Sequence, residues 1–197
     1  MSKITAWSEE NVSLTTLQNI QYQPSNGIDI IDRSNLTTAV QSNGTIRLVF
    51  FTPGRSMTVS NFTVGCNTGA TDTGGTTVRK LGLFTVSGTS VTCVARSAND
   101  TALGTSSNTI YTKAFTSEAG YSSSYTLIAG TTYAVGWLFY NTGGTFAGPT
   151  MATSPATTSA VALLTPYYVA GVSGQTDITN TPITISAGGI GPYVRLT

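Results

Sequence analysis

Apolar and polar residues alternate with a period of two along most of the chain after residue 35. The alternation is clear in residues 57–64, a pattern typical of half-buried β-strands, and residues 45–52 and 78–86 are also predicted to be strands. Glycine-containing turns separate the segments: Ser87-Gly88-Thr89 is short enough to predict a hairpin into residues 91–94. The chain after residue 35 is therefore predicted to be built from strands.

Residues 125–140 form the most apolar part of the chain, with Gly130 as a turn between two expected strands. The second strand is almost continuously apolar, which predicts a central strand covered on both faces. Helical periodicity is essentially absent elsewhere. About ten short strands separated by Gly, Ser and Thr loops predict an all-β fold. The expected architecture is a single β-sandwich of jelly-roll type over residues 36–197.

The first 35 residues follow a different pattern. Their apolar residues are scattered, and a turn signal follows at residues 23–27. We interpret residues 1–35 as an extended N-terminal arm for attachment or assembly, because such a segment cannot bury its own side chains. The alternative is a first strand and loop of the same domain. The arm residues expected to dock on a partner chain are Trp7, Val12, Leu14, Leu17 and Ile20.

Composition narrows the functional classes. Charged residues make up 9% of 197 residues, the formal net charge is +1, and His is absent. A chain so poor in Lys and Arg offers no electrostatic footprint for nucleic acid, and no apolar run is long enough for membrane insertion. The first ten residues also lack the apolar region of a secretory signal. We therefore expect synthesis in a host cytoplasm without a signal peptide.

The acidic residues do not form a recognisable catalytic or metal-binding pattern. Asp72 and Asp100 lie in loops rich in oxygen-bearing neighbours. Two functional roles are therefore considered for them: a calcium site and the carboxylate pair of a glycosidase. Neither loop has the spaced acids of a calcium loop, and Asp in turns more often bonds its own backbone. Because the chain has no His, a serine or threonine nucleophile would lack its usual general base. We expect no enzyme activity, no catalytic residue, no metal and no cofactor.

Three polar loops are candidates for ligand contact: residues 68–76, 96–108 and 117–124. Tyr121 stands among small residues, where its ring is expected to be exposed and to serve as an adaptable contact. We predict Tyr121, Asp72 and Asp100 as the ligand-binding residues. Because these loops contain no charge cluster, attachment through them should depend little on salt.

Two cysteines, Cys66 and Cys93, lie in alternating apolar segments. Small buried side chains on strands are the favoured interpretation. Whether the two pair in a disulfide depends on distances that sequence does not supply.

The segment from residue 78 to residue 139 carries a strand, a hairpin, a Thr/Ser loop and then Tyr-Thr-Leu-Ile-Ala-Gly-Thr-Thr-Tyr-Ala-Val-Gly-Trp at residues 125–137. In this it resembles the β-sandwich surface proteins of tailed bacteriophage virions: tail-fibre heads, minor tail proteins and head-decoration proteins. The resemblance covers residues 40–197 and leaves head and tail locations open.

This resemblance implies a non-enzymatic structural protein located in the virion. It further implies other virion proteins as partners, homo-oligomers with a trimer favoured, and host-surface glycans as a candidate ligand. A similar Gly-Thr-x-Tyr element, here Gly130 to Tyr133, occurs in carbohydrate-binding jelly rolls. A carbohydrate-binding module without catalytic activity is therefore the alternative.

Overall fold

A computed structural model describes residues 27–30, 36–118, 120–154, 169–187 and 190–197. All regular secondary structure in these ranges is β, and all strand pairs are antiparallel. Sheet A contains β1 (Ile28–Asp29), β2 (Thr37–Val40), β5 (Asn61–Thr68), β8 (Thr109–Ala114), β11 (Thr150–Ser154), β15 (Gly191–Pro192) and β16 (Arg195–Leu196). Sheet B contains β3 (Ile46–Phe51), β6 (Thr76–Ser87), β7 (Ser90–Arg96), β10 (Tyr133–Thr142), β12 (Val169–Val172), β13 (Ile183–Thr184) and β14 (Ser186–Ala187). A separate pair joins β4 (Met57–Val59) to β9 (Tyr125–Leu127).

Sheet A is organised around β5. On one side β5 pairs with β8, and on the other it pairs with β16 near its start and β11 near its end. β1 then pairs with β16, and β2 pairs with β11. Among the described residues, β1, β2, β8 and β15 each pair with one other strand of the sheet.

Sheet B has β10 at its centre, in the order β13-β7-β6-β10-β3-β12-β14. Val135 of β10 lies opposite Val49 of β3 and Leu83 of β6. The backbones approach closely at Gly136, where an added Cβ would lie 1.8 Å from the Arg47 carbonyl oxygen. Only glycine fits this close approach of β10 to β3.

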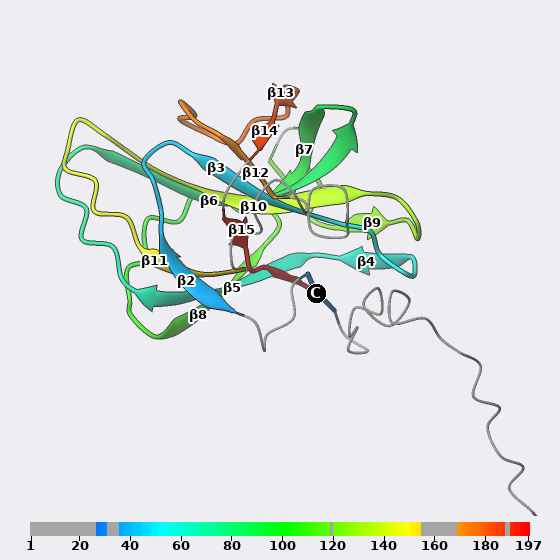
Figure 1. The fold of residues 1–197 in the computed structure, drawn as a ribbon, viewed down its shortest axis with the longest axis horizontal. Coiled ribbons are helices and arrows are strands. Elements are labelled where there is room, and N and C mark those ends of the chain that lie inside the picture. The colour runs from blue at the N-terminus through cyan, green and yellow to red at the C-terminus, as the bar shows by residue number, and fades with distance from the viewer. Residues whose placement is uncertain (1–26, 31–35, 119, 155–168, 188–189) are drawn as a thin grey trace, which may run out of the picture.

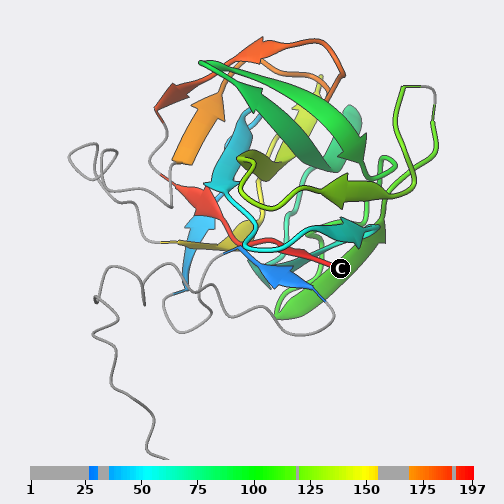
Figure 2. The same cartoon turned by 90° about the vertical axis from the view of Figure 1, so that its right-hand side faces the viewer.

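The main core lies between the two sheets. Phe62 and Val64 of sheet A and Trp137 and Leu83 of sheet B belong to the same buried cluster. Figures 1 and 2 show sheet A below sheet B. The side chains of this cluster come from strands of both sheets. An all-β fold of antiparallel sheets with a shared apolar interior is the part of the predicted architecture that the structure confirms.

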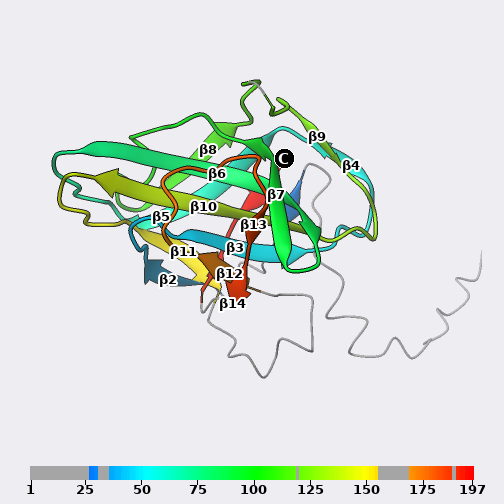
Figure 3. The same cartoon turned by 90° about the horizontal axis from the view of Figure 1, so that it is seen from above.

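A second buried cluster covers the opposite face of sheet B. Phe84, Cys93 and Leu138 point into it, and Ile178 from the segment before β13 closes it. Figure 3 looks down on this upper layer, where β13 and β7 lie close together. The prediction that the strand after Gly130 is central and covered on both faces is confirmed, because consecutive residues of β10 enter the two clusters alternately.

The predicted hairpin is also confirmed. Ser87 pairs with Ser90, and Gly88 between them has a φ of 57°. The three polar loops fall between β5 and β6, β7 and β8, and β8 and β9, as the sequence predicted. The all-β class and antiparallel sheets are therefore observed, whereas this strand order does not by itself establish jelly-roll connectivity.

The last described residues of the predicted arm belong to sheet A. Ile28 and Ile30 are fully buried in the main core, and Asp29 accepts a hydrogen bond from the Tyr193 hydroxyl at 2.7 Å. Residues 27–30 therefore pack as part of the folded domain, in the manner of the alternative first strand. The remaining arm residues, Trp7, Val12, Leu14, Leu17 and Ile20, lie outside the described residues.

Cys66 and Cys93 are both free and buried. Cys66 belongs to the main core on β5, while Cys93 belongs to the second cluster on β7. They face opposite sides of sheet B, so the two thiols do not pair. No helix among the described residues is long and apolar enough to cross a membrane.

Candidate functional site

Two polar clusters are built around neighbouring residues of β6. Arg79 and Lys80 are both buried, although they interrupt a strand that is otherwise mostly apolar. Because successive side chains of a strand point to opposite faces, they enter opposite sides of sheet B. Arg79 lies on the side of Leu81 and Leu83, and Lys80 on the side of Phe84. We call these the Arg79 cluster and the Lys80–Arg96 cluster.

The Arg79 guanidinium joins two of the predicted contact loops. Its Nη2 donates to Oδ2 of Asp72 at 2.8 Å, and its Nη1 donates to the Leu103 carbonyl oxygen at 2.7 Å. The two charged side chains are only 3% and 5% exposed. The other Asp72 oxygen accepts a hydrogen bond from the Ala147 amide at 2.8 Å, which adds a third loop.

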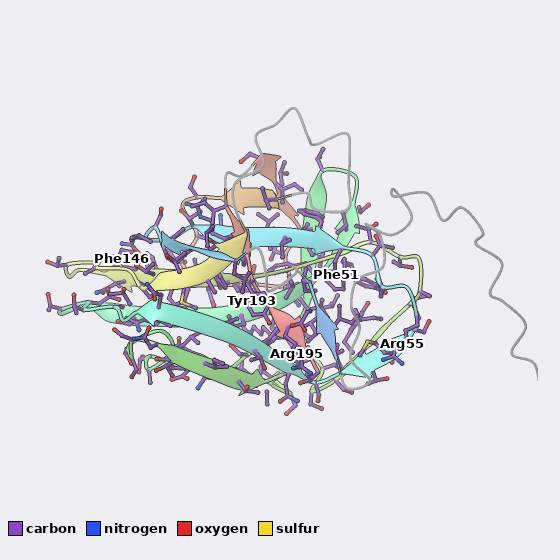
Figure 4. All side chains as sticks on the ribbon, turned by 60° about the horizontal axis from the view of Figure 1, so that its bottom comes forward. Phe51, Arg55, Phe146, Tyr193 and Arg195 are labelled. Atoms are coloured by element: carbon purple, nitrogen blue, oxygen red, sulfur yellow. The ribbon has the colours of Figure 1, made fainter. Side chains whose placement is uncertain are left out.

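Asp72 is buried and engaged by these partners, and its predicted role in ligand binding stays a prediction. A carboxylate that is held by a buried arginine and a backbone amide has little capacity left for an external ligand. Asp72 anchors the loop end of the molecule, the end that carries Phe146 in Figure 4.

Asp100 is also structural. Its Oδ1 accepts a hydrogen bond from the Ala102 amide at 2.9 Å, and its Oδ2 forms an ion pair with Lys113 of β8. Burial alone would raise the pKa of Asp100. The hydrogen bond and charge of Lys113, the Ala102 amide and the charge of Arg79 outweigh that effect and lower the pKa. The carboxylate bonds its own turn, as expected for an aspartate in a loop.

The Lys80–Arg96 cluster lies on the outer side of sheet B. The Arg96 guanidinium carbon lies 4.2 Å from the centre of the Tyr121 ring, in cation–π geometry. Its Nη2 donates to Oε2 of Glu118 at 2.5 Å, and its Nη1 donates to the Ile178 carbonyl oxygen at 2.5 Å. Arg96 therefore connects the end of β7 to the loop of residues 116–124 and to the segment before β13.

Asp177 completes this cluster. Its carboxylate oxygens lie 2.7 Å from Lys80 Nζ and 3.4 Å from Arg96 Nη1, and one of them accepts a hydrogen bond from the Ile178 amide at 2.7 Å. Burial alone would lower the pKa of Arg96, but the Glu118 hydrogen bond and the charges of Tyr121, Asp177 and Glu118 raise it. Two cations and two carboxylates balance, so the cluster carries no net charge.

Tyr121 is not the freely exposed ring that the sequence predicted. It is half-buried against the second core cluster, and its hydroxyl donates to the Ile178 carbonyl oxygen at 3.3 Å. Burial is the main reason that the pKa of its hydroxyl is raised, while the Arg96 charge opposes the shift. Loop glycines and serines around Tyr121 gave no sequence signal of this packing, because the apolar partner comes from the distant residue Ile178.

The predicted ligand-binding residues therefore divide between two places. Asp72 pairs with Arg79, and Asp100 donates its amide to the Arg79 carbonyl oxygen at 3.1 Å, whereas Tyr121 belongs to the Lys80–Arg96 cluster. The residues missed from sequence are Arg79, Lys80, Arg96 and Asp177. For Arg79 and Lys80, the sequence signal was a pair of adjacent cations inside a predicted apolar strand.

The described carboxylates share one property: each has a specific partner. Asp72, Asp100, Glu118 and Asp177 form ion pairs, and Asp29 accepts from Tyr193. Within the described ranges, no group of three or more His, Cys, Asp or Glu side chains is placed to hold a metal ion. The ion pairs of these clusters hold loop residues against strand residues.

Comparison of the chain with protein-family models, with curated proteins and with solved structures found no match.

Proposed function

We propose that this chain is a non-enzymatic structural protein on the surface of a bacteriophage virion, where it contacts other virion proteins as a homo-oligomer. The observation that carries the non-enzymatic part is the engagement of all five described carboxylates in ion pairs or hydrogen bonds. General acid or base catalysis requires a carboxyl group that can reach substrate and exchange a proton. Asp72 and Asp177, which are held by the buried cations Arg79 and Lys80, serve rigidity instead.

Composition and resemblance support the virion location. The chain combines a large apolar core with 9% charged residues and many Thr-bearing strand surfaces. Exposed threonines pair across strands, as in Thr63 with Thr112 at 3.0 Å and Thr58 with Thr126 at 3.1 Å. Such a surface has high β-propensity without charged partners. The jelly-roll type of the sandwich and a head or tail position remain parts of this proposal.

The same proposal includes contact with host-surface glycans through the Lys80–Arg96 cluster. Arg96 covers one face of the Tyr121 ring, so a sugar would meet the ring edge and the carboxylate of Glu118, which is 46% exposed. Because the cluster is balanced in charge, adsorption should change little with ionic strength.

Immunogold electron microscopy tests the virion location. Antibodies raised against the purified chain are applied to intact particles from the phage whose genome encodes it. We expect labelling at a regular position on the particle surface. Intact particles without label, together with labelled disrupted particles, would place the chain elsewhere and overturn the proposal.

Adsorption measurements test the glycan contact. Particles that carry Glu118→Ala or Tyr121→Ala should adsorb to cells about 5- to 30-fold more weakly, the range of an interface anchor worth about 1–2 kcal/mol. Thr58→Ala, an exposed change on β4, is the matched control. Since Tyr121 also packs in the second cluster, Glu118→Ala decides the outcome. Unchanged adsorption with that variant would remove glycan contact from the proposal.

The alternative function is a carbohydrate-binding module without catalytic activity. The specific observation in its favour is the neutral Tyr121–Arg96–Glu118 surface group. Glycan binding by the purified chain, combined with absence from particles, would favour this alternative.

A further inference from the structure

The turn between β2 and β3, residues 41–45, carries the chain from one sheet to the other, and we call it the crossing turn. β2 belongs to sheet A and β3 to sheet B. Figure 1 shows the chain leaving β2 in the lower layer and entering β3 in the upper one. The start of the crossing turn is fixed by Gln41, which is buried. Its Oε1 accepts a hydrogen bond from the Trp137 indole at 2.8 Å, and its amide donates to the Pro149 carbonyl oxygen at 2.9 Å.

Within the crossing turn, the side chain of Asn43 takes the place of a strand residue beside β10. Its Oδ1 accepts a hydrogen bond from the Asn141 amide at 2.9 Å, and its Nδ2 donates to the Asn141 carbonyl oxygen at 3.0 Å. A residue of a neighbouring antiparallel strand would exchange the same two bonds with its partner. The backbone pairing of β3 with β10 ends at Arg47 opposite Trp137, so Asn43 continues the contact beyond that point.

The next residue, Gly44, is held through its backbone. Its amide donates to the Phe139 carbonyl oxygen at 2.9 Å, and its own carbonyl oxygen accepts a hydrogen bond from the Gln175 amide at 2.8 Å. Its φ is 63°, and an added Cβ would lie 2.9 Å from the Gln175 carbonyl oxygen. Both facts require glycine here. The fold therefore specifies the dipeptide Asn43-Gly44 through contacts of both residues.

An asparagine followed by glycine is chemically reactive, because glycine has no side chain to shield its backbone nitrogen. We propose that Asn43 is a deamidation site that the closed crossing turn keeps unreactive and that reacts once the turn opens. In the reaction the Gly44 nitrogen loses its proton and bonds to Asn43 Cγ. The bond from Cγ to Nδ2 breaks, ammonia leaves with that proton, and a succinimide ring forms. Water then opens the ring, which leaves aspartate or isoaspartate at position 43.

Hydrogen bonds, and not burial, protect Asn43 in the folded chain. Asn43 is exposed, so water reaches it. The reaction requires Cγ to turn toward the Gly44 nitrogen, which breaks both hydrogen bonds between Asn43 and Asn141. It also requires the Gly44 amide to give up its proton, which the Phe139 carbonyl oxygen holds. Deamidation therefore needs a local opening that breaks these three bonds together, and such an opening is rare in a folded domain.

The product cannot remake the contact that protected the asparagine. A carboxylate at position 43 has no N–H to donate, so it places an oxygen against the Asn141 carbonyl oxygen where Nδ2 donated before. Isoaspartate also adds one carbon to the backbone of the crossing turn. The reaction is irreversible because ammonia is lost. The crossing turn thus acts as a one-way switch, in which a single opening weakens the link between the two sheets permanently. This inference does not depend on the proposed function.

Mass spectrometry of the purified full chain tests the protection. Native chain, urea-unfolded chain and a synthetic peptide of residues 38–47 are incubated at pH 8 and 37 °C, and deamidation at Asn43 is followed in tryptic digests. We expect the native chain to react at least about tenfold more slowly than the peptide. The unfolded chain should react at the rate of the peptide, with Asn26-Gly27 as an internal reference. Equal rates in the native chain and the peptide, or protection that persists in urea, would overturn the inference.

Thermal unfolding of the product mimic tests the one-way step. Asn43→Asp carries the product carboxylate without the change in backbone, and its melting temperature should fall by about 2–6 °C. Asn67→Asp is the matched control, because Asn67 is an exposed asparagine of β5, and its melting temperature should stay within about 1 °C of the wild type. Equal melting temperatures of the two variants would show that the contact with Asn141 does not hold the crossing turn, and would overturn the switch.

Discussion

At the scale of single residues, the charged side chains of this protein act mainly as connectors. Arg79 and Lys80 leave β6 on opposite faces, and each meets a carboxylate from a distant loop. The Arg79–Asp72 pair is nearly fully buried, whereas Glu118 of the second cluster is half-exposed. Because water screens exposed pairs, similar contacts should contribute very differently to stability.

Removing the charge of Asp72 should strongly destabilise the fold. Asp72→Asn leaves the Arg79 guanidinium buried without its counterion, and breaking a buried pair in this way costs about 3–5 kcal/mol. Urea unfolding followed by fluorescence of the buried Trp137 measures the free energy of unfolding. Glu118→Gln is the control and should cost about 1 kcal/mol or less. Equal effects of the two substitutions would show that burial does not distinguish the clusters.

At the scale of elements, β1 defines where the folded domain begins. The sequence pattern suggested a boundary at residue 35, yet Ile28 and Ile30 contribute to the main core. The strand is only two residues long, so it carries too little alternation for sequence to distinguish it from an arm. Its pairing with β16 depends on the other end of the chain, which a local pattern does not reveal.

Two deletions separate the arm from β1. A chain that lacks residues 2–22 should keep the melting temperature of its monomer nearly unchanged. Deletion of residues 2–30 removes two fully buried isoleucines as well, each worth about 2–5 kcal/mol. Its melting temperature should fall by 10 °C or more, on the scale of about 2–4 °C per kcal/mol for a domain of this size. Scanning calorimetry measures both, and similar curves would mean that β1 is not part of the cooperative unit.

At the scale of the whole molecule, the two buried thiols lie in the two different core clusters. Cys66 lies between the sheets, and Cys93 lies on the other side of sheet B. Burial raises the pKa of the Cys93 thiol to about 12, with Arg96 opposing the shift. A thiol kept neutral in the fold adds stability that is complete below its unfolded pKa, near 9. That stability is lost as the pH rises toward 12.

Thiol labelling should therefore follow global unfolding. At pH 8 the native chain should react with neither an aromatic disulfide nor a maleimide reagent, and the urea-unfolded chain should show two thiols without added reductant. Both cysteines should label at the same rate in intermediate urea, because the two clusters should unfold in one cooperative transition. Different rates, measured by mass spectrometry, would show that the two layers open separately.

The sequence by itself determined the all-β class, the central strand, the hairpin at Gly88 and the buried cysteines. Each depends on alternation or turn chemistry within a few neighbouring residues, so local order suffices to predict it. Tertiary structure alone decided that Asp72 meets Arg79, that Tyr121 packs beneath Arg96, and that residues 28–30 join sheet A. These outcomes depend on which distant segments share a face, a property of sheet order. In a chain rich in Thr, Ser and Gly, many loops look alike, and only long-range packing distinguishes an anchored side chain from an exposed one.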